Sequence, residues 1–487
     1  MKILMVTAEL TPFAKTGGLA DMVSALSLAL HKTGADVRIV MPRYYSIPRE
    51  GLTRLEDPLG VPLAWKEEWT AVYTAKLSGK VTVFFIDHEQ FFGRDGVYGS
   101  PWERDFHDNP LRFSLLCNGA FQLCRKLSWI PEVIHAHDWS GALAMPLLKF
   151  RERYREFKKT AGVFTIHNMG YQGIYPKDFF PQLGLPWDCF YASGFEDWDR
   201  INFLKAGISS AAALTTVSPT YAREIQSPES GFRLDGLLRA RASCLSGILN
   251  GVDTEIWNPS KDAFLAKKYT LNTVSTGKAA NKRALQERMG LEVSDKIPII
   301  GIVTRLVDQK GVAELFAPTW GCMYRVCATM KVQVALLGSG EHWCESEILE
   351  LQKKLPVFRA QVGYSEELSH LIEAGSDFFL MPSRYEPCGL NQMYSLLYGT
   401  LPIVRRTGGL ADTVQNYDER TGEGTGFMFD NLTPDTVYDT VGWAVWAWYN
   451  KRDHITEMRK RGMAQKFGWD IAAKSYLQVY RNALGKH

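Results

Sequence analysis

The chain has 487 residues, of which 46% are hydrophobic and 22% charged, and its formal net charge is +3. These values predict two or three domains with large cores and exclude a surface that coats nucleic acid, so any phosphate binding must come from a local site. The 8 cysteines are scattered and form no C-x-x-C pair, which indicates reduced thiols in a cytoplasmic protein, and no apolar run approaches the ~18 residues of a membrane span.

Short apolar runs alternate with helical patterns through the first half of the chain. The first run ends at Glu9 and Pro12, so we expect a strand there and not a signal peptide. The alternation predicts a parallel sheet built from βαβ units. The expected strands are Ile3–Val6, Val37–Val40, Val81–Ile86, Val133–Ala136, Val163–Ile166 and Leu214–Val217, with helices such as Leu19–Leu30 and Asn118–Leu127.

A second series of strands follows an Asn-Gly turn at residues 250–251 and a lysine-rich stretch over 261–282. The last segment, Trp469–Leu484, is predicted to be an amphipathic helix with Asp470 as its N-cap. The fold class is therefore α/β, with two doubly wound domains, 1–250 and 251–464, and ligands in a cleft outside the carboxyl ends of the strands. The expected strands of the second domain are Ile299–Val303, Val332–Leu337, Gln361–Gly363, Phe378–Met381 and Leu401–Val404.

The hexapeptide Thr-Gly-Gly-Leu-Ala-Asp occurs twice, at residues 16–21 and 407–412, each time after a strand-like run and a basic residue, Lys15 or Arg406. Paired glycines between a strand and a helix let backbone N–H groups approach an anion at the helix N-terminus. The repeat predicts two phosphate-binding loops on two domains that hold one phosphate-bearing ligand. The alternative is that each glycine pair simply makes a tight turn.

The stretch from Met381 to Tyr394 is the richest in chemistry, because a strand enters a proline-bounded loop there and Gly389 opens a helix. Glu386 lies in this loop. Its carboxylate could oppose a developing positive charge or hold sugar hydroxyls, and the alternative is that it caps the helix.

Arg305 and Lys310 lie together on the loop that follows the strand Ile299–Val303. A guanidinium binds phosphate as a fork and an ammonium binds it as a point charge, so the pair suits a diphosphate. The alternative is two solvated basic residues.

Three further segments carry candidate polar residues. His135-Ala-His137-Asp138-Trp139 could supply metal ligands, but no third cluster has a matching spacing, so we favour a strand-end Asp138 and Trp139 that face the cleft. His167 and Asn168 follow another strand on the same side. The segment Asp197-Trp198-Asp199 matches the D-x-D metal-binding pattern, which arises readily by chance, and we reject it because no strand precedes it.

Taken together, these motifs resemble those of the bacterial glycogen/starch synthases, in family order and over the whole chain. They are Lys-Thr-Gly-Gly-Leu-Ala-Asp, His-Ala-His-Asp-Trp, His-Asn-x-x-Tyr-Gln-Gly, Asn-Gly-Val-Asp-x-x-x-Trp-Asn-Pro, Arg-Leu-x-x-Gln-Lys-Gly, Glu-Pro-Cys-Gly-Leu and Arg-Arg-Thr-Gly-Gly-Leu-Ala-Asp-Thr-Val. The resemblance implies a GT-B fold of two Rossmann-like domains with an interdomain cleft. It also implies retaining transfer of glucose from ADP-glucose to the 4-OH of an α-1,4-glucan, with no cofactor and no metal, and a C-terminal helix within 465–487 that packs back on the N-terminal domain.

The resemblance also implies roles for individual residues. His167 would lie by the transferred sugar, Asp138 by the acceptor, Lys15 by phosphate and acceptor, and Tyr364 against the adenine. Glu386 would position the glucose, while Arg305 and Lys310 would neutralise the diphosphate with help from backbone amides. The other residues expected at the site are Gly17, Gly18, Asp21, Asn168, Asn250, Cys388, Gly389, Leu390, Asn391 and Thr407.

One position departs from the family pattern, and a second, in keeping with the resemblance to glycogen synthases, differs only from other retaining transferases. Asn391 stands where the family commonly has Thr, although an asparagine can still donate to phosphate. Tyr394 stands where related retaining transferases have a second Glu. A UDP-sugar transferase of the same fold and a non-catalytic glucan-binding scaffold are the alternative functions, and the intact Glu386, Arg305, Lys310 and Lys15 argue against the scaffold. The residues leave the choice of ADP-glucose or UDP-glucose, the primer length and the oligomeric state open.

Overall fold

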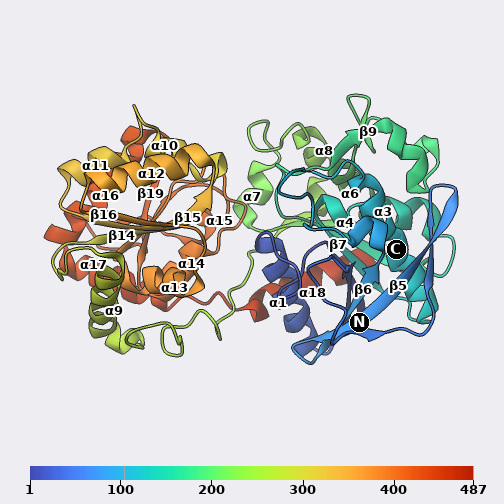
Figure 1. The fold of residues 1–487 in the computed structure, drawn as a ribbon, viewed down its shortest axis with the longest axis horizontal. Helices are drawn as coiled ribbons and strands as arrows, with labels where there is room; N and C mark the ends of the chain where they lie inside the picture. Colours follow the sequence, from blue (N-terminus) through green and yellow to red (C-terminus); the bar gives the residue numbers. More distant parts are fainter. Residues whose placement is uncertain (104, 486–487) are drawn as a thin grey trace. The chain divides into compact units, whose positions relative to one another are not determined.

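The computed structural model describes residues 1–103 and 105–485, so the last two residues of the predicted C-terminal segment 465–487 lie outside the described residues. The chain divides into two compact units: Met1–Gly251 together with the segment that begins at Trp469, and Val252–Gly468. Each unit is built on its own sheet, with helices packed against it (Figure 1).

The first unit has a sheet in the order β13-β12-β8-β7-β1-β2-β6-β5-β3, and β4 pairs with β5. Strands β7 and β8 are buried at every residue, as expected for parallel strands covered by helices on both faces. The strands are β1 Lys2–Val6, β2 Asp36–Pro42, β3 Thr53–Arg54, β4 Leu59–Leu63, β5 Lys66–Leu77, β6 Val81–Asp87, β7 Val133–His137, β8 Ala161–Ile166, β12 Ala213–Thr216 and β13 Leu245–Gly247, and β9 Ile174–Pro176, β10 Glu196–Asp197 and β11 Arg200–Asn202 form a small separate sheet.

Helices of the first unit connect these strands. The helix α1 begins directly after the first Gly-Gly pair and buries its apolar face. The helices are α1 Gly18–Lys32, α2 Glu89–Phe92, α3 Asn109–Lys126, α4 Asp138–Gly141, α5 Ala144–Leu147, α6 Phe203–Ser210, α7 Pro219–Glu224, α8 Asp235–Ala240 and α18 Trp469–Leu484.

Helix α18 belongs to the first unit although the whole second unit precedes it in the chain. It packs against α1, β8 and β12. The hydroxyl of its Tyr480 lies 2.8 Å from Nδ1 of His135 in β7, and both side chains are fully buried. This packing completes the cover over one face of the first sheet.

The second unit has a parallel sheet in the order β16-β15-β14-β17-β18-β19. The strands are β14 Ile299–Leu306, β15 Gln333–Gly340, β16 Phe358–Val362, β17 Phe378–Met381, β18 Leu401–Arg405 and β19 Phe427–Phe429. The helices are α9 Val274–Met289, α10 Val312–Phe316, α11 Met323–Thr329, α12 His342–Lys354, α13 Glu366–Gly375, α14 Asn391–Leu397, α15 Gly408–Thr413, α16 Pro434–Asn450 and α17 Arg452–Met463.

The structure corrects several expected element boundaries. The antiparallel strands β3, β4 and β5 were not expected, and neither was β19. Helix α3 begins at Asn109 and not at Asn118, because Pro110 in its first turn favours an earlier start. Asp470 is not the N-cap of α18, because the helix already begins at Trp469 and the aspartate lies in its first turn. Among the described residues no helix is both long and apolar enough to cross a bilayer.

Candidate active site

The predicted site residues of the second unit follow neighbouring strands. Arg305 lies near the end of β14, Glu386 follows β17, and Thr407 follows β18. These three strands are adjacent and parallel, so their carboxyl ends meet at one edge of the sheet. The topology therefore brings together side chains that are far apart in the sequence.

Glu386 is the centre of this cluster. Its Oε2 lies 2.5 Å from Nζ of Lys310 and accepts a 2.9 Å hydrogen bond from Oγ of Ser383. Both partners of the ion pair are largely buried, with exposed side-chain fractions of 18% for Lys310 and 7% for Glu386. Helix α14 has Leu390 as its N-cap with no side-chain cap, so Glu386 does not cap it and that alternative is wrong.

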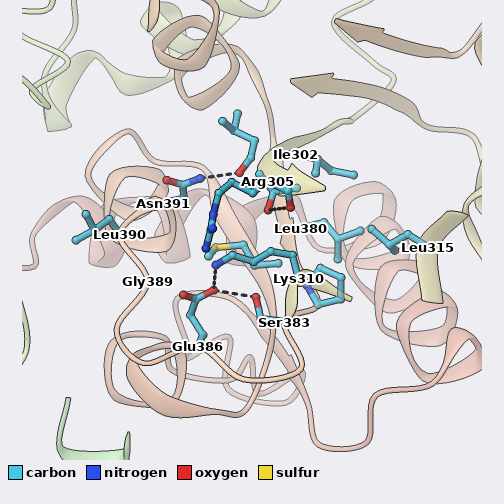
Figure 2. Close-up of a pocket in the computed structure, with 14 residues that line it drawn as sticks. Ile302, Arg305, Lys310, Leu315, Leu380, Ser383, Glu386, Gly389, Leu390 and Asn391 are labelled. Atoms are coloured by element: carbon cyan, nitrogen blue, oxygen red, sulfur yellow. Dashed lines mark hydrogen bonds and ion pairs between the residues drawn. The ribbon is translucent and has the colours of Figure 1, made fainter. Parts of the chain in front are cut away.

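Arg305 is exposed and lies beside Lys310 (Figure 2). Its guanidinium makes no hydrogen bond or ion pair with any residue from 1 to 103 or from 105 to 485. Because Lys310 is paired and Arg305 is not, the two cations are not equivalent. Arg305 is ready to bind an anion, whereas Lys310 would have to share its charge with Glu386.

A cavity of about 150 Å³ opens beside these side chains. Apolar groups of β14 and β17 and the charged groups of Arg305, Lys310 and Glu386 line it together (Figure 2). The lining residues are Ile302, Val303, Thr304, Arg305, Lys310, Leu315, Leu380, Met381, Pro382, Ser383, Glu386, Gly389, Leu390 and Asn391.

The second Thr-Gly-Gly copy packs against the loop that carries Glu386. A Cβ on Gly408 would lie 1.8 Å from the Glu386 carbonyl oxygen, and one on Gly409 would lie 1.9 Å from that of Cys388. The Gly409 amide donates to the Glu386 carbonyl at 3.1 Å. These glycines permit a close approach of the two backbone segments, which fixes Glu386 in place. The Gly409 amide was expected to bind phosphate, but it bonds to this loop instead.

The remaining predicted residues of the second unit lie around this loop. Tyr364 is 82% exposed just beyond the end of β16, while Cys388 is buried. One N–H of Asn391 is committed to the Val303 carbonyl at 2.8 Å, so the side chain braces β14 and has one N–H left with which to donate to phosphate.

In the first unit, Asp138 and His167 follow the adjacent strands β7 and β8. The Asp138 carboxylate accepts a 2.7 Å hydrogen bond from the His167 amide. Burial, with a smaller contribution from the negative charge of Glu9, raises the pKa of Asp138 to about 7, although hydrogen bonds from the backbone amides of His167 and Asn168 act in the opposite direction. Burial lowers the pKa of His167 to about 3, so its ring is neutral at physiological pH.

The neighbouring histidines are core residues. His135 is held by Tyr480 and by Thr165, and His137 Nδ1 lies 3.2 Å from His167 Nε2. Within the described ranges no three His, Cys, Asp or Glu side chains are grouped to hold a metal ion. Trp139 does not face a cleft as expected, since it is 7% exposed and packs edge-to-face on Phe113.

Lys15 and Asp21 form an ion pair of 2.7 Å, and Thr11 Oγ1 donates to the same carboxylate at 2.7 Å. The Gly17 amide donates to the side chain of Glu9 at 3.1 Å, which corrects its expected use for diphosphate, and Gly18 begins helix α1. Glu9 was not expected among these contacts, because its position in the sequence indicates only the end of a strand.

Three other predicted positions are also described. Asn250 is buried at the end of the first unit, and Asn168 Oδ1 accepts the Gly170 amide at 2.9 Å. Asp197 ends the short strand β10, and residues 198–199 form the turn to β11, so a strand does lead into this segment, contrary to expectation. Asp197 pairs with Arg233, and Asp199 pairs with Lys177.

Comparison with known proteins gives matches along most of the chain. Residues 2–240 match the starch synthase catalytic domain family, and residues 286–460 match the glycosyl transferases group 1 family. The chain is 62% identical to the glycogen synthase of Treponema denticola over 100% of its length and 99% of the relative's. It is 44% identical to glycogen synthase 1 of Geobacter metallireducens, covering 100% and 97% of the two chains.

Two solved structures are also similar. The catalytic domain of starch synthase IV from Arabidopsis thaliana, bound to ADP and acarbose, has a TM-score of 0.90 at 31% identity and covers 99% of each chain. The sucrose-phosphate synthase of Thermosynechococcus elongatus has a TM-score of 0.61 at 16% identity over 100% of each chain, which shows the shared fold alone.

Two Rossmann-like sheets, with charged residues at the carboxyl ends of their parallel strands, define a glycosyltransferase of the GT-B class, as expected from the sequence. Within that class the identities are high and extend over the full chain. The chain belongs to the bacterial glycogen synthase family.

Proposed function

We propose that the chain transfers glucose from ADP-glucose to the 4-OH at the non-reducing end of an α-1,4-glucan, with retention of anomeric configuration. The observation that carries the proposal is the Arg305 guanidinium, which has no partner among the described residues and lines the cavity together with the Lys310–Glu386 ion pair. The full-length identity to glycogen synthases and the likeness to a starch synthase bound to ADP and acarbose support the donor and acceptor.

The diphosphate leaving group develops negative charge as the glycosidic bond breaks. Arg305 and Lys310 would neutralise that charge, and the N-terminus of α14 adds its dipole. Lys310 is paired with Glu386 before the reaction begins. Its ammonium would therefore interact less with the carboxylate and more with the diphosphate as the reaction proceeds. Stabilisation of this kind is stronger in the transition state than in the ground state, as catalysis requires.

Glu386 would position the glucose and stabilise its developing positive charge. Of the residues that the structure describes, only Lys310 and Ser383 donate to its carboxylate, and both use Oε2. Oε1 therefore points to no protein donor and could accept a sugar hydroxyl. An attacking nucleophile is not required if the acceptor approaches on the leaving-group face and the departing phosphate takes its proton.

Groups of the first unit would serve the sugar and the acceptor. Asp138 would accept a hydrogen bond from the glucan hydroxyl, and the neutral His167 would contact the transferred glucose. Lys15, now paired with Asp21, would turn toward phosphate. Tyr364 would stack against adenine. The buried and partly buried thiols, none in a disulfide within the described part of the chain, support our proposal that the protein acts in the cytoplasm.

Initial rates with ADP-glucose and UDP-glucose on a glycogen primer test the proposal. We expect a clear preference for ADP-glucose, with radiolabelled glucose incorporated into glycogen and released by α-1,4-specific hydrolysis. A preference for UDP-glucose would favour the alternative transferase, and no transfer from either donor would favour a glucan-binding scaffold.

A further inference from the structure

Glu9 lies in the loop between β1 and α1, and its side chain is almost completely buried, with 3% of the residue exposed. A buried carboxylate is unfavourable unless several donors compensate for its lost hydration. Nothing in the proposed reaction uses this residue. Its partners therefore show what the charge is for.

The Glu9 carboxylate accepts four hydrogen bonds, and three of them come from the first Thr-Gly-Gly copy. Oε2 accepts from the backbone amides of Thr16 at 2.5 Å and of Gly17 at 3.1 Å. Oε1 accepts from the Thr16 hydroxyl at 2.7 Å and from the Tyr98 hydroxyl at 2.8 Å. Consecutive amides at the start of a helix form an anion-binding nest, and here the anion is a side chain of the same chain.

The glycine pair of this loop is not held by close packing. A Cβ added to Gly17 or Gly18 would meet no atom within 4 Å, whereas Gly408 and Gly409 of the second copy are in close backbone contact. Hydrogen bonds to Glu9 therefore fix the backbone at residues 16 and 17. Because Lys15 directly precedes these residues, the same bonds limit where its ammonium can reach.

Tyr98 connects this loop to the Asp138 end of the sheet. Its hydroxyl donates to Glu9, and its ring packs on Trp139 with centroids 5.6 Å apart. Trp139 is the direct neighbour of Asp138. Glu9 thus joins the Lys15 loop and the end of β7 through one hydrogen bond and one ring contact.

We propose that Glu9 is a positioning residue that occupies the anion nest of the first repeat and thereby directs Lys15 toward the donor. The inference rests on the proposed transfer from ADP-glucose. It adds that the diphosphate does not bind the Thr16 and Gly17 amides, so Lys15 is the group through which this loop acts on the donor. The two identical hexapeptides would then perform different tasks, one by holding a carboxylate and the other by holding a backbone loop.

Two substitutions at Glu9 distinguish a side chain that keeps the shape of the carboxylate from one that leaves the nest empty. In Glu9→Gln, the amide oxygen can accept from the two backbone amides while the NH₂ group donates to the Thr16 and Tyr98 oxygens. In Glu9→Ala the nest is vacated. We expect Glu9→Ala to lower kcat/KM for ADP-glucose about 10²-fold, mostly through a higher KM, because misplacing a substrate-binding group by about 1 Å has an effect of that size. Glu9→Gln should retain most of the activity.

Formate provides the decisive readout. At constant ionic strength, formate should fill the vacated nest of Glu9→Ala and restore kcat/KM with a saturating concentration dependence. It should not change the wild type or Glu9→Gln, whose nests are occupied. As a matched control, Glu152→Ala removes another carboxylate of the first unit that is 2% exposed and is bonded to Arg125 and Arg151, away from this loop. It should lower the melting temperature without raising KM for ADP-glucose.

Several results would overturn the inference. One is a Glu9→Ala enzyme with KM for ADP-glucose within about threefold of wild type, a difference worth little transition-state energy. Another is a folded Glu9→Ala enzyme that formate does not rescue, with Glu9→Gln equally impaired. Wild-type activity in the same assay separates these outcomes from a failure of the proposed function, which would leave every variant and the wild type inactive on ADP-glucose.

Discussion

Replacing Glu386 with Gln is the most informative perturbation of the second unit. The substitution keeps the size of the side chain and its bond from Ser383, but it removes the negative charge 2.5 Å from the Lys310 ammonium. Turnover should fall about 10²–10³-fold, because a group that stabilises charge in the transition state typically contributes that much. ADP binding should not weaken if, as proposed, the carboxylate contacts the sugar and not the nucleotide.

The geometry also fixes the direction of the change in ADP affinity. A charge-assisted hydrogen bond contributes about 1.5–3 kcal/mol net, and in the wild type the diphosphate must compete with Glu386 for part of that interaction with Lys310. Loss of the competitor should therefore tighten ADP binding, by up to about tenfold if roughly 1.4 kcal/mol is released. The same loss leaves Lys310 without its counterion, so the free energy of unfolding should fall by about 1–3 kcal/mol.

Calorimetric titration with ADP, together with initial rates on glycogen, tests this reasoning. Asp377→Asn is the matched control, because Asp377 forms a buried ion pair of 2.8 Å with Lys282 at the opposite end of the same strand, β17. That variant should lose stability while each folded molecule keeps its turnover. If ADP affinity of Glu386→Gln fell as steeply as its turnover, Glu386 would support the structure of the nucleotide site and our assignment would be refuted.

Further predictions concern charge, metal and pH. Arg305→Ala should lower turnover about 10²–10³-fold, and a value within threefold of wild type would remove the residue from the leaving-group role. Activity should persist in excess EDTA, whereas loss that Mn²⁺ restores would show that the D-x-D segment was wrongly rejected. Because the pKa of Asp138 is raised to about 7, kcat/KM should rise with pH up to that value, and Asp138→Asn should abolish this limb. Burial likewise raises the pKa of Glu373 from 4.5 to about 8, so folding favours its neutral form. The free energy of unfolding should decrease as pH rises through this window, and urea titrations should show a flatter dependence for Glu373→Gln.

Most parallel strands of both sheets could be predicted because each is a short apolar run between helical patterns, whereas β13 and β19, of three residues each, were not expected. Strands β14 and β17 are examples. Because they are neighbours and parallel, the loops that follow them lie at the same edge of the sheet, where Lys310 and Glu386 meet. The antiparallel β5 was missed because its Lys66–Leu77 sequence carries charged residues and is only partly buried, so no continuous apolar run marks it.

Less of the candidate site than of the fold could be predicted from the sequence. Residue types identified Arg305 and Glu386, but a glycine pair looks the same whether its amides bind phosphate, a side chain or a neighbouring loop. For the first copy, the group that the amides bind is Glu9, which lies outside the repeat. Glu9 also accepts a hydrogen bond from Tyr98, which is distant in the sequence, and no local pattern reveals that contact. The use of one Asn391 donor by Val303 is equally invisible in sequence.

The position of α18 has a consequence for biosynthesis. The first 251 residues leave the ribosome before the 217 residues of Val252–Gly468, yet the helix that covers β8 and β12 is translated only after them. At about 5–20 residues per second, the first sheet would wait roughly 10–45 s with the binding surface for α18 uncovered. During that interval the buried imidazole of His135 lacks its Tyr480 partner. The nascent N-terminal unit would thus expose an apolar surface to chaperones until the residues of α18 have been translated.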